Sequence, residues 1–114
     1  MLNLTVQEAS CLHDCLDCLT ACENCATACL GEPDVAMMTE CIRIDRDCAD
    51  ICALCARLMV RNSDLITEIC RLCATACDLC AEECERHDHD HCKRCAAACR
   101  KCAESCRAVA QAEA

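Results

Sequence analysis

The sequence predicts an all-α protein, an antiparallel up-down-up-down four-helix bundle whose core is lined with cysteine. Two observations lead to this prediction. The chain has 20 cysteines among 114 residues, and they recur mostly at steps of three and four, which keeps each series on one face of an α-helix. It also has one glycine, one proline and no aromatic residue, which argues against a loop-rich disulfide scaffold and an aromatic core. The length suits one domain, 1–114.

The cysteines fall into four groups, and each group predicts one helix with a cysteine stripe. Steps that alternate between three and four residues average 3.5, the spacing of a coiled-coil seam, so the stripes should face the bundle axis. The groups are Cys11, Cys15, Cys18, Cys22, Cys25 and Cys29; Cys41, Cys48, Cys52 and Cys55; Cys70, Cys73, Cys77, Cys80 and Cys84; and Cys92, Cys95, Cys99, Cys102 and Cys106.

The first helix is predicted over residues 5 to 30. Thr5 and Glu8 fit the capping box that begins many helices, and Gly31 and Pro33 fit its end. Aspartate or serine residues that can act as N-caps precede the three later helices. Their predicted bounds are Asp34 to about Arg61, Ser63 to about Arg86, and Asp88 or Asp90 to about Ala110. The connections are then short, which places successive helices side by side and antiparallel.

A second apolar stripe runs beside the cysteines on three of the four helices and should seal the flanks of the bundle. On the fourth helix these positions are mostly alanine, so this helix packs more closely or contributes less. A leftover apolar face is also a candidate surface for a homo-oligomer. The stripe consists of Leu12, Leu16, Leu19, Ile51, Leu54, Leu58, Ile69, Leu72 and Leu79.

Charge and hydropathy argue against two kinds of partner and indicate a cellular compartment. The formal net charge is −9, which argues against nucleic acid because phosphate binding needs clustered lysine and arginine. No apolar run approaches the roughly 18 residues of a membrane span, and the first residues lack the features of a secretory signal. We therefore expect a cytoplasmic protein whose thiols stay reduced and available to metal ions.

The number of thiols favours a monovalent soft metal ion. Soft thiolate ligands select Cu(I), zinc or iron–sulfur clusters. Twenty Cu(I) ions would neutralise 20 thiolates, whereas zinc bound by four thiolates each would leave about half of the negative charge uncompensated in a buried core. Iron–sulfur clusters need cysteines gathered around one point, and a straight helix spreads them out. Multiple Cu(I) ions are the expected ligands, in a number that the sequence does not fix.

The same cysteines are also compatible with two other functions. A zinc or heavy-metal thiolate buffer and a thiol-disulfide redox protein both remain alternatives, because some cysteine pairs one turn apart could approach bridging distance. The pattern contains no nucleophile and base arrangement that specifies a reaction, so an enzyme is not expected. Elemental analysis and a thiol count on the metal-free protein would separate these cases.

The cysteine steps resemble those of the four-helix-bundle copper storage proteins of bacteria, specifically their cytosolic members. The resemblance rests on the repeated Cys-x3-Cys and Cys-x2-Cys steps and covers nearly the whole chain. It implies Cu(I) bound by thiolates inside each bundle, assembly into a homotetramer, and a role in storing copper or limiting its toxicity.

Four residues interrupt or extend the cysteine stripes and are further candidate metal ligands. The steps of the second helix place Asp45 on its inner face, or at the surface if the helix is slightly rotated, and extension backward reaches Met38. Continuation of the third stripe beyond Cys84 reaches His87 and, if the helix lasts that far, His91. Methionine and histidine suit Cu(I), whereas a carboxylate suits it poorly.

An up-down bundle brings the first and third connections to the same end. Cys29, Met37, Met38, His87, His89 and His91 should gather there, and we call this end of the bundle the mouth. We expect copper to enter at the mouth, as the family resemblance also implies, although Met38 could equally fill the core and His89 and His91 could lie in a solvated loop. At the other end an apolar plug is expected from Leu4, Val6, Met59, Leu65 and Ile66, while His13 should face outward.

Overall fold

The computed structural model describes residues 3–113, and over these residues the chain forms four α-helices and one short 3-10 helix. Each α-helix carries one of the four cysteine groups, as predicted. The elements are α1 (Val6–Leu30), η1 (Val35–Met38), α2 (Thr39–Val60), α3 (Ile66–Cys84) and α4 (Asp90–Glu113).

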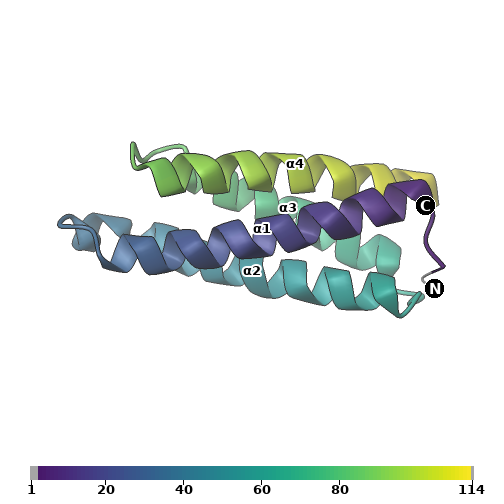
Figure 1. The fold of residues 1–114 in the computed structure, drawn as a ribbon. Coiled ribbons are helices and arrows are strands. Elements are labelled where there is room, and N and C mark those ends of the chain that lie inside the picture. The colour runs from purple at the N-terminus through teal and green to yellow at the C-terminus, as the bar shows by residue number, and fades with distance from the viewer. Residues whose placement is uncertain (1–2, 114) are drawn as a thin grey trace.

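The four helices run antiparallel in chain order, and the last one closes the bundle against the first (Figure 1). The molecule is elongated, with extents of 46 × 23 × 18 Å. The α1–α2 and α3–α4 connections lie at one end, whereas both termini and the α2–α3 connection lie at the other (Figure 1). This confirms the up-down-up-down bundle and brings the residues of the predicted mouth to one end.

The predicted helix starts were right for α1 and wrong for two others. Thr5 caps α1, and its side chain and that of Glu8 form the reciprocal capping box. Asp34 makes no capping bond, because the chain first forms η1 and α2 begins only at Thr39. Ser63 accepts a bond from the Leu65 amide in a turn, and α3 begins later, at Ile66.

The α2–α3 connection depends on one residue with a positive φ. Asn62 has φ 55°, a conformation that asparagine adopts more easily than most residues. The Asn62 amide donates to the Met59 carbonyl, and the Ser63 amide donates to the Leu58 carbonyl. These bonds satisfy the last carbonyls of α2 and reverse the chain within a few residues.

The core contains cysteine and alanine where most bundles have leucine. Alanine lies beside the cysteines on all four helices, for example Ala49, Ala81 and Ala103, and its small side chain allows the backbones to approach closely. The predicted flanking stripe is only partly buried. Leu12, Leu19, Ile51 and Leu58 pack against the core, but Leu16, Leu54, Leu72 and Leu79 are between 41% and 50% exposed.

The end opposite the mouth is closed by aliphatic packing, although the predicted plug was partly wrong. Met59 and Ile66 are buried there as expected, together with Val109, which was not predicted. Val6 is 88% exposed and Leu65 56% exposed, because Val6 is the first residue of α1 and Leu65 immediately precedes α3. We call the end formed by Met59, Ile66 and Val109 the closed end.

Among the described residues, no helix is long and apolar enough to cross a membrane.

Candidate metal centre

All twenty cysteines are free thiols, and each is fully buried along the axis of the bundle. The 3.5-residue spacing of each group keeps its side chains on the inner face of its helix, which explains why none reaches solvent. Sulfur atoms therefore form one continuous array between the two ends, and it is described below from the closed end to the mouth.

Near the closed end the sulfur atoms meet across neighbouring helices. Cys11 and Cys106 have their Sγ atoms 3.5 Å apart. The Sγ atoms of Cys15 and Cys102 are 3.7 Å apart, and those of Cys55 and Cys70 are 3.9 Å apart. A disulfide bond is about 2.05 Å long, so these contacts are between separate thiols.

In the middle of the bundle each thiol touches several others. The Sγ atom of Cys18 lies 3.6 Å to 4.0 Å from four other sulfur atoms, which come from all four helices. These neighbours are Cys22, Cys48, Cys77 and Cys99. Cys18 on α1 therefore meets Cys77 on the opposite helix α3 directly at the axis.

These distances suit metal ions that bridge thiolates. Two sulfur atoms bound to one ion at about 2.3 Å each are at most about 4.6 Å apart. Sets of four sulfur atoms that lie within 4.8 Å of one another recur along the axis. One set is Cys11, Cys15, Cys55 and Cys106, and another is Cys22, Cys80, Cys95 and Cys99. Neighbouring sets share members, so a thiolate can bridge ions of adjacent sets.

Asp45 replaces a thiol in the half of the array nearer the mouth and is fully buried, as the helical register predicted. Cys80 and Cys95 donate S–H bonds to its Oδ1 at 3.2 Å and 3.3 Å, and Cys84 donates at 3.5 Å. Burial raises the pKa of Asp45 to about 10, with the nearby Cys95 adding to the effect. Asp45 is therefore a neutral carboxylic acid at pH 7.

His91 reaches the sulfur array from the mouth. Its Nδ1 lies 3.4 Å from Cys25 Sγ, 3.5 Å from Cys92 Sγ and 3.9 Å from Cys29 Sγ. The prediction reached His91 by continuing the third helix, but α3 ends at Cys84 and His91 lies in the first turn of α4. The orientation follows from its position four residues before Cys95, about one helical turn, which places His91 on the inner face of α4 at the start of the fourth cysteine stripe.

Two other predicted candidates lie at the same end with different surroundings. Met38 is fully buried at the end of η1 and belongs to the core cluster. The prediction for His87 was wrong in orientation, because α3 ends at Cys84 and the His87 Nε2 instead lies 2.8 Å from Glu83 Oε2. His13 faces outward at 70% side-chain exposure, as expected.

Burial favours the protonated form of two thiols near the mouth, Cys29 and Cys92. It raises the pKa of Cys29 to about 12, and the neighbouring Cys41 adds to this. It likewise raises the pKa of Cys92. In the absence of metal these thiols hold their protons at pH 7, and a metal ion that binds them as thiolates must displace those protons.

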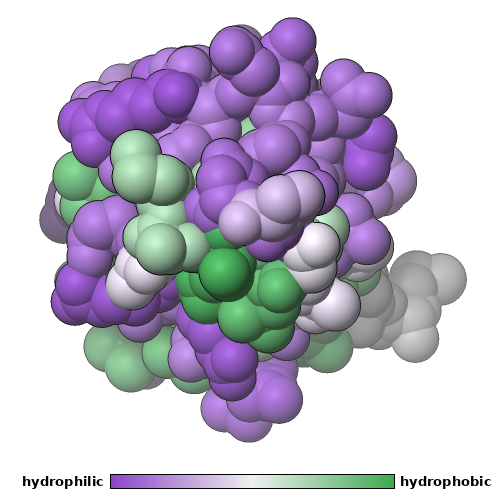
Figure 2. Space-filling view, turned by 90° about the vertical axis from the view of Figure 1, so that its left-hand side faces the viewer, coloured by the Kyte–Doolittle hydropathy of each residue, from purple (hydrophilic) through white to green (hydrophobic). Residues whose placement is uncertain are grey.

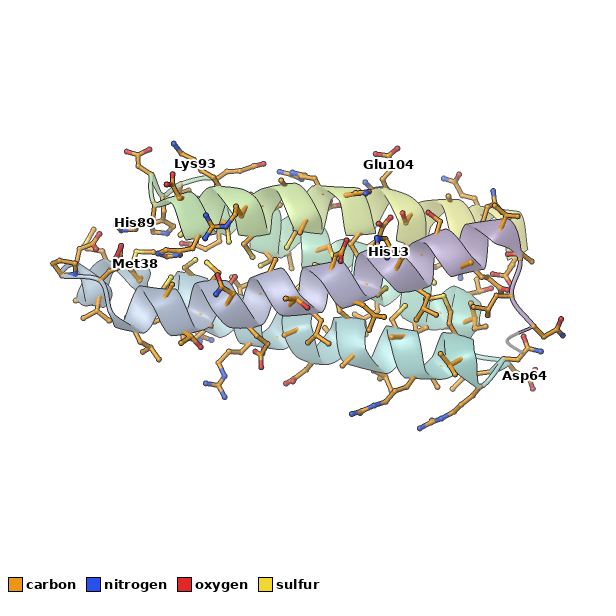
Figure 3. All side chains as sticks on the ribbon, viewed as in Figure 1. His13, Met38, Asp64, His89, Lys93 and Glu104 are labelled. Atoms are coloured by element: carbon orange, nitrogen blue, oxygen red, sulfur yellow. The ribbon has the colours of Figure 1, made fainter. Side chains whose placement is uncertain are left out.

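The mouth contains three polar residues whose arrangement the sequence did not indicate. His89 Nδ1 lies 2.6 Å from Glu32 Oε2, and His89 Nε2 lies 3.2 Å from Asp34 Oδ1. Figure 3 shows His89 near Met38 at this end and His13 well along α1 towards the other. Glu32 and Asp34 lie in the α1–α2 connection, where helical periodicity gives no signal, so only the fold could bring them to His89.

A sequence model described as Csp, copper storage protein, matches residues 5–111. No match was found among curated proteins.

Several solved structures are similar. The Cu(I)-bound copper storage protein BsCsp3 is 49% identical, with a TM-score of 0.88 over 91% of this chain and 98% of that chain. The apo form of copper storage protein 3 from Bacillus subtilis is 49% identical, with a TM-score of 0.83 over 90% and 97%. A cytosolic copper storage protein from Streptomyces lividans with five coppers is 42% identical, with a TM-score of 0.89 over 92% and 92%.

Proposed function

The chain belongs to the copper storage protein family, and we propose that it stores Cu(I) by binding many of these ions to the thiolates inside its helix bundle. One observation supports this above the others. Twenty fully buried thiols form a continuous array in which neighbouring sulfur atoms are 3.5 Å to 4.0 Å apart. A protein of this size gains little from such a core unless metal binding replaces the lost hydrophobic stabilisation.

Charge favours Cu(I) over zinc as the stored ion. A thiolate and a Cu(I) ion together are neutral, so the core can fill without unpaired charge, whereas four thiolates around each zinc leave net negative charge in a dry interior. Asp45 supports the same choice because it is already neutral at pH 7 and adds no charge to the core. The reactive groups of the interior are buried thiols, which admit an ion rather than an organic substrate, so we infer a store and not an enzyme.

We infer that copper enters at the mouth. His91 connects the outer part of the mouth with the sulfur array. Its Nε2 lies near Glu32, and its Nδ1 touches the thiols of Cys25 and Cys92. Met38 is a second soft donor at the same end. The proposed ligands are therefore the twenty cysteines and His91, with Met38 in the path, while Asp45 acts as a hydrogen-bonding partner of thiols.

The mouth is largely hydrophilic and has an apolar cluster near its centre (Figure 2). The α1–α2 connection contributes exposed Leu30, Val35 and Met37 to this end. We propose that these residues shield the sulfur array from water while an ion passes between them and the histidines. The closed end, where Met59 and Val109 are fully buried, is the less favourable route.

We propose the compartment from one relative and the assembly from the family resemblance. The Streptomyces lividans relative is described as cytosolic, and we propose the same compartment, in which thiols stay reduced. We also propose a homotetramer, as the family resemblance implies. Leu54 and Leu72 are exposed on α2 and α3 and line an apolar groove of about 210 Å³ that a second copy could cover. Light scattering after size-exclusion chromatography would measure the assembly.

A competition titration tests the storage function. The reduced apoprotein is titrated with Cu(I) in the presence of a Cu(I)-specific chelator, and then again after preincubation with Zn²⁺. We expect about ten to twenty Cu(I) ions per chain for twenty cysteines, and an unchanged capacity after zinc. Uptake of only one or two ions, or a capacity that zinc abolishes, would rule out a copper store.

A further inference from the structure

A second group of metal-binding side chains lies at the mouth, outside the sulfur array. Glu32 Oε2 is 2.6 Å from His89 Nδ1 and 3.6 Å from His91 Nε2. The two imidazole rings are stacked, with centroids 5.2 Å apart and planes 8° from parallel. His89 Nδ1 and His91 Nε2 therefore both approach the same carboxylate oxygen, Glu32 Oε2.

The other nitrogen of each ring is already engaged, which fixes the direction of the rings. His89 Nε2 lies 3.2 Å and 3.4 Å from the two carboxylate oxygens of Asp34. His91 Nδ1 faces the thiols of Cys25 and Cys92. A carboxylate that holds the far nitrogen of a histidine is the usual support of a metal-binding imidazole, because it fixes the tautomer and orients the ring.

An unpaired nitrogen points into this group. His91 Nε2 is buried and lacks a hydrogen-bond partner among the described residues, although the imidazole as a whole keeps 11% of its surface exposed. Buried polar atoms are nearly always satisfied, and leaving one unsatisfied costs free energy. A ligand that accepts the lone pair of this nitrogen would remove that cost.

From this geometry we propose that Glu32, His89 and His91 bind one divalent cation of borderline softness, such as Zn²⁺, at the mouth. Two imidazoles and one carboxylate are an established zinc donor set, with solvent in the fourth position. A surface depression of about 470 Å³ lies beside the site and is lined by His89 and its partner Asp34. The site uses the lone pair of His91 Nε2, so while the cation is bound His91 Nδ1 keeps its proton and donates a hydrogen bond to the thiolates of the array instead of binding Cu(I).

The position of the cation affects how fast stored Cu(I) can leave the protein. A cation bound to His91 covers the outer face of the residue through which we propose that copper reaches Cys25 and Cys92. It therefore slows the exchange of Cu(I) with an external chelator. This second part of the inference rests on the proposed function, whereas the cation site rests on Glu32, His89 and His91 alone.

The experiment uses copper-loaded protein, in which the thiols are occupied. Protein of measured copper content is dialysed against buffered Zn²⁺, and zinc and copper are determined in the same sample. We expect one Zn²⁺ per chain without copper loss, and slower removal of Cu(I) by chelator. Glu32→Gln and His89→Ala should each lose the zinc, and Asp34→Asn should weaken its binding about 10- to 100-fold. His13→Ala is the matched control, because this exposed histidine also faces a carboxylate, that of Asp17.

Three results would overturn the site: wild-type protein that retains no zinc, zinc that is retained equally by Glu32→Gln and His89→Ala, or zinc uptake matched by copper release. A failure of the storage function would be visible earlier, as protein that takes up no copper. The apoprotein would then be probed with Co²⁺, because nitrogen and oxygen ligands lack the intense sulfur-to-cobalt absorption of thiolate ligands. Absorption that is only of the thiolate type would equally exclude the site.

Discussion

At the mouth the sulfur array ends in histidine, methionine and carboxylate groups, whereas at the closed end it ends in the packed aliphatic side chains of Met59, Ile66 and Val109. The thiols between the two ends differ little in burial, since all are fully buried. The comparison separates two tasks of the molecule. We expect the capacity to depend on the array as a whole, and the rate of copper exchange and the pH response of stability to depend more on the half nearer the mouth.

The largest expected difference between the two halves is the response to pH, since Asp45 is the buried carboxyl nearer the mouth. Its pKa is about 10 in the folded state against 3.8 without burial, so between these pH values the folded protein holds a proton that the unfolded chain has lost. The free energy of unfolding of the wild-type protein therefore falls as pH rises through this range. Asparagine does not titrate, so Asp45→Asn lacks this pH dependence. The free energy of unfolding of the variant minus that of the wild type should rise by about 1.4 kcal/mol per pH unit, which is about 4 kcal/mol from pH 5 to pH 8.

Urea unfolding of the reduced apoproteins at pH 5 and pH 8 measures this difference. The thiols titrate alike in both proteins, so their contribution cancels in the comparison. A gap between variant and wild type that is the same at both pH values would mean that Asp45 is ionised in the fold.

Two buried methionines allow the ends to be compared directly. Met38 at the mouth and Met59 at the closed end are both fully buried, so Met38→Ala and Met59→Ala should each lower the free energy of unfolding of the apoprotein by about 3 kcal/mol. Only Met38→Ala should slow copper uptake, because a thioether near the path is lost. Denaturant unfolding and stopped-flow uptake measure the two effects, and equal slowing by both variants would show that the ends do not differ in access.

The smallest expected free-energy effect is that of His91, and it concerns mainly the rate of copper uptake. His91→Ala should slow Cu(I) uptake from a chelated donor about tenfold, equivalent to about 1.4 kcal/mol, with capacity reduced by at most about one ion. His87→Ala is the control, because its imidazole pairs with Glu83 and, among the described residues, no hydrogen bond joins it to a thiol. Uptake that is slowed as much by His87→Ala as by His91→Ala would contradict the assignment of His91.

Much of this architecture could be predicted from the sequence because cysteine spacing is periodic. Steps of three and four determine which face of each helix is buried, and the same register placed Asp45 and Met59 correctly. Periodicity ends where the helices end. The capping roles of Asp34 and Ser63, the orientation of His87 and the exposure of Leu65 were therefore wrong, since each depends on where a turn begins. The contact of Glu32 with His89 depends on two connections meeting in space, which no local pattern encodes.

The central claim is that copper fills the sulfur array between the two ends. The most direct test is an anomalous difference map at the copper edge, from crystals of the fully loaded protein. We expect copper peaks along the bundle axis in both halves, each within bonding distance of cysteine Sγ atoms from neighbouring helices. Peaks restricted to the surface or the mouth, with the thiols around Cys18 and Cys77 unmetallated or joined as disulfides, would contradict the claim.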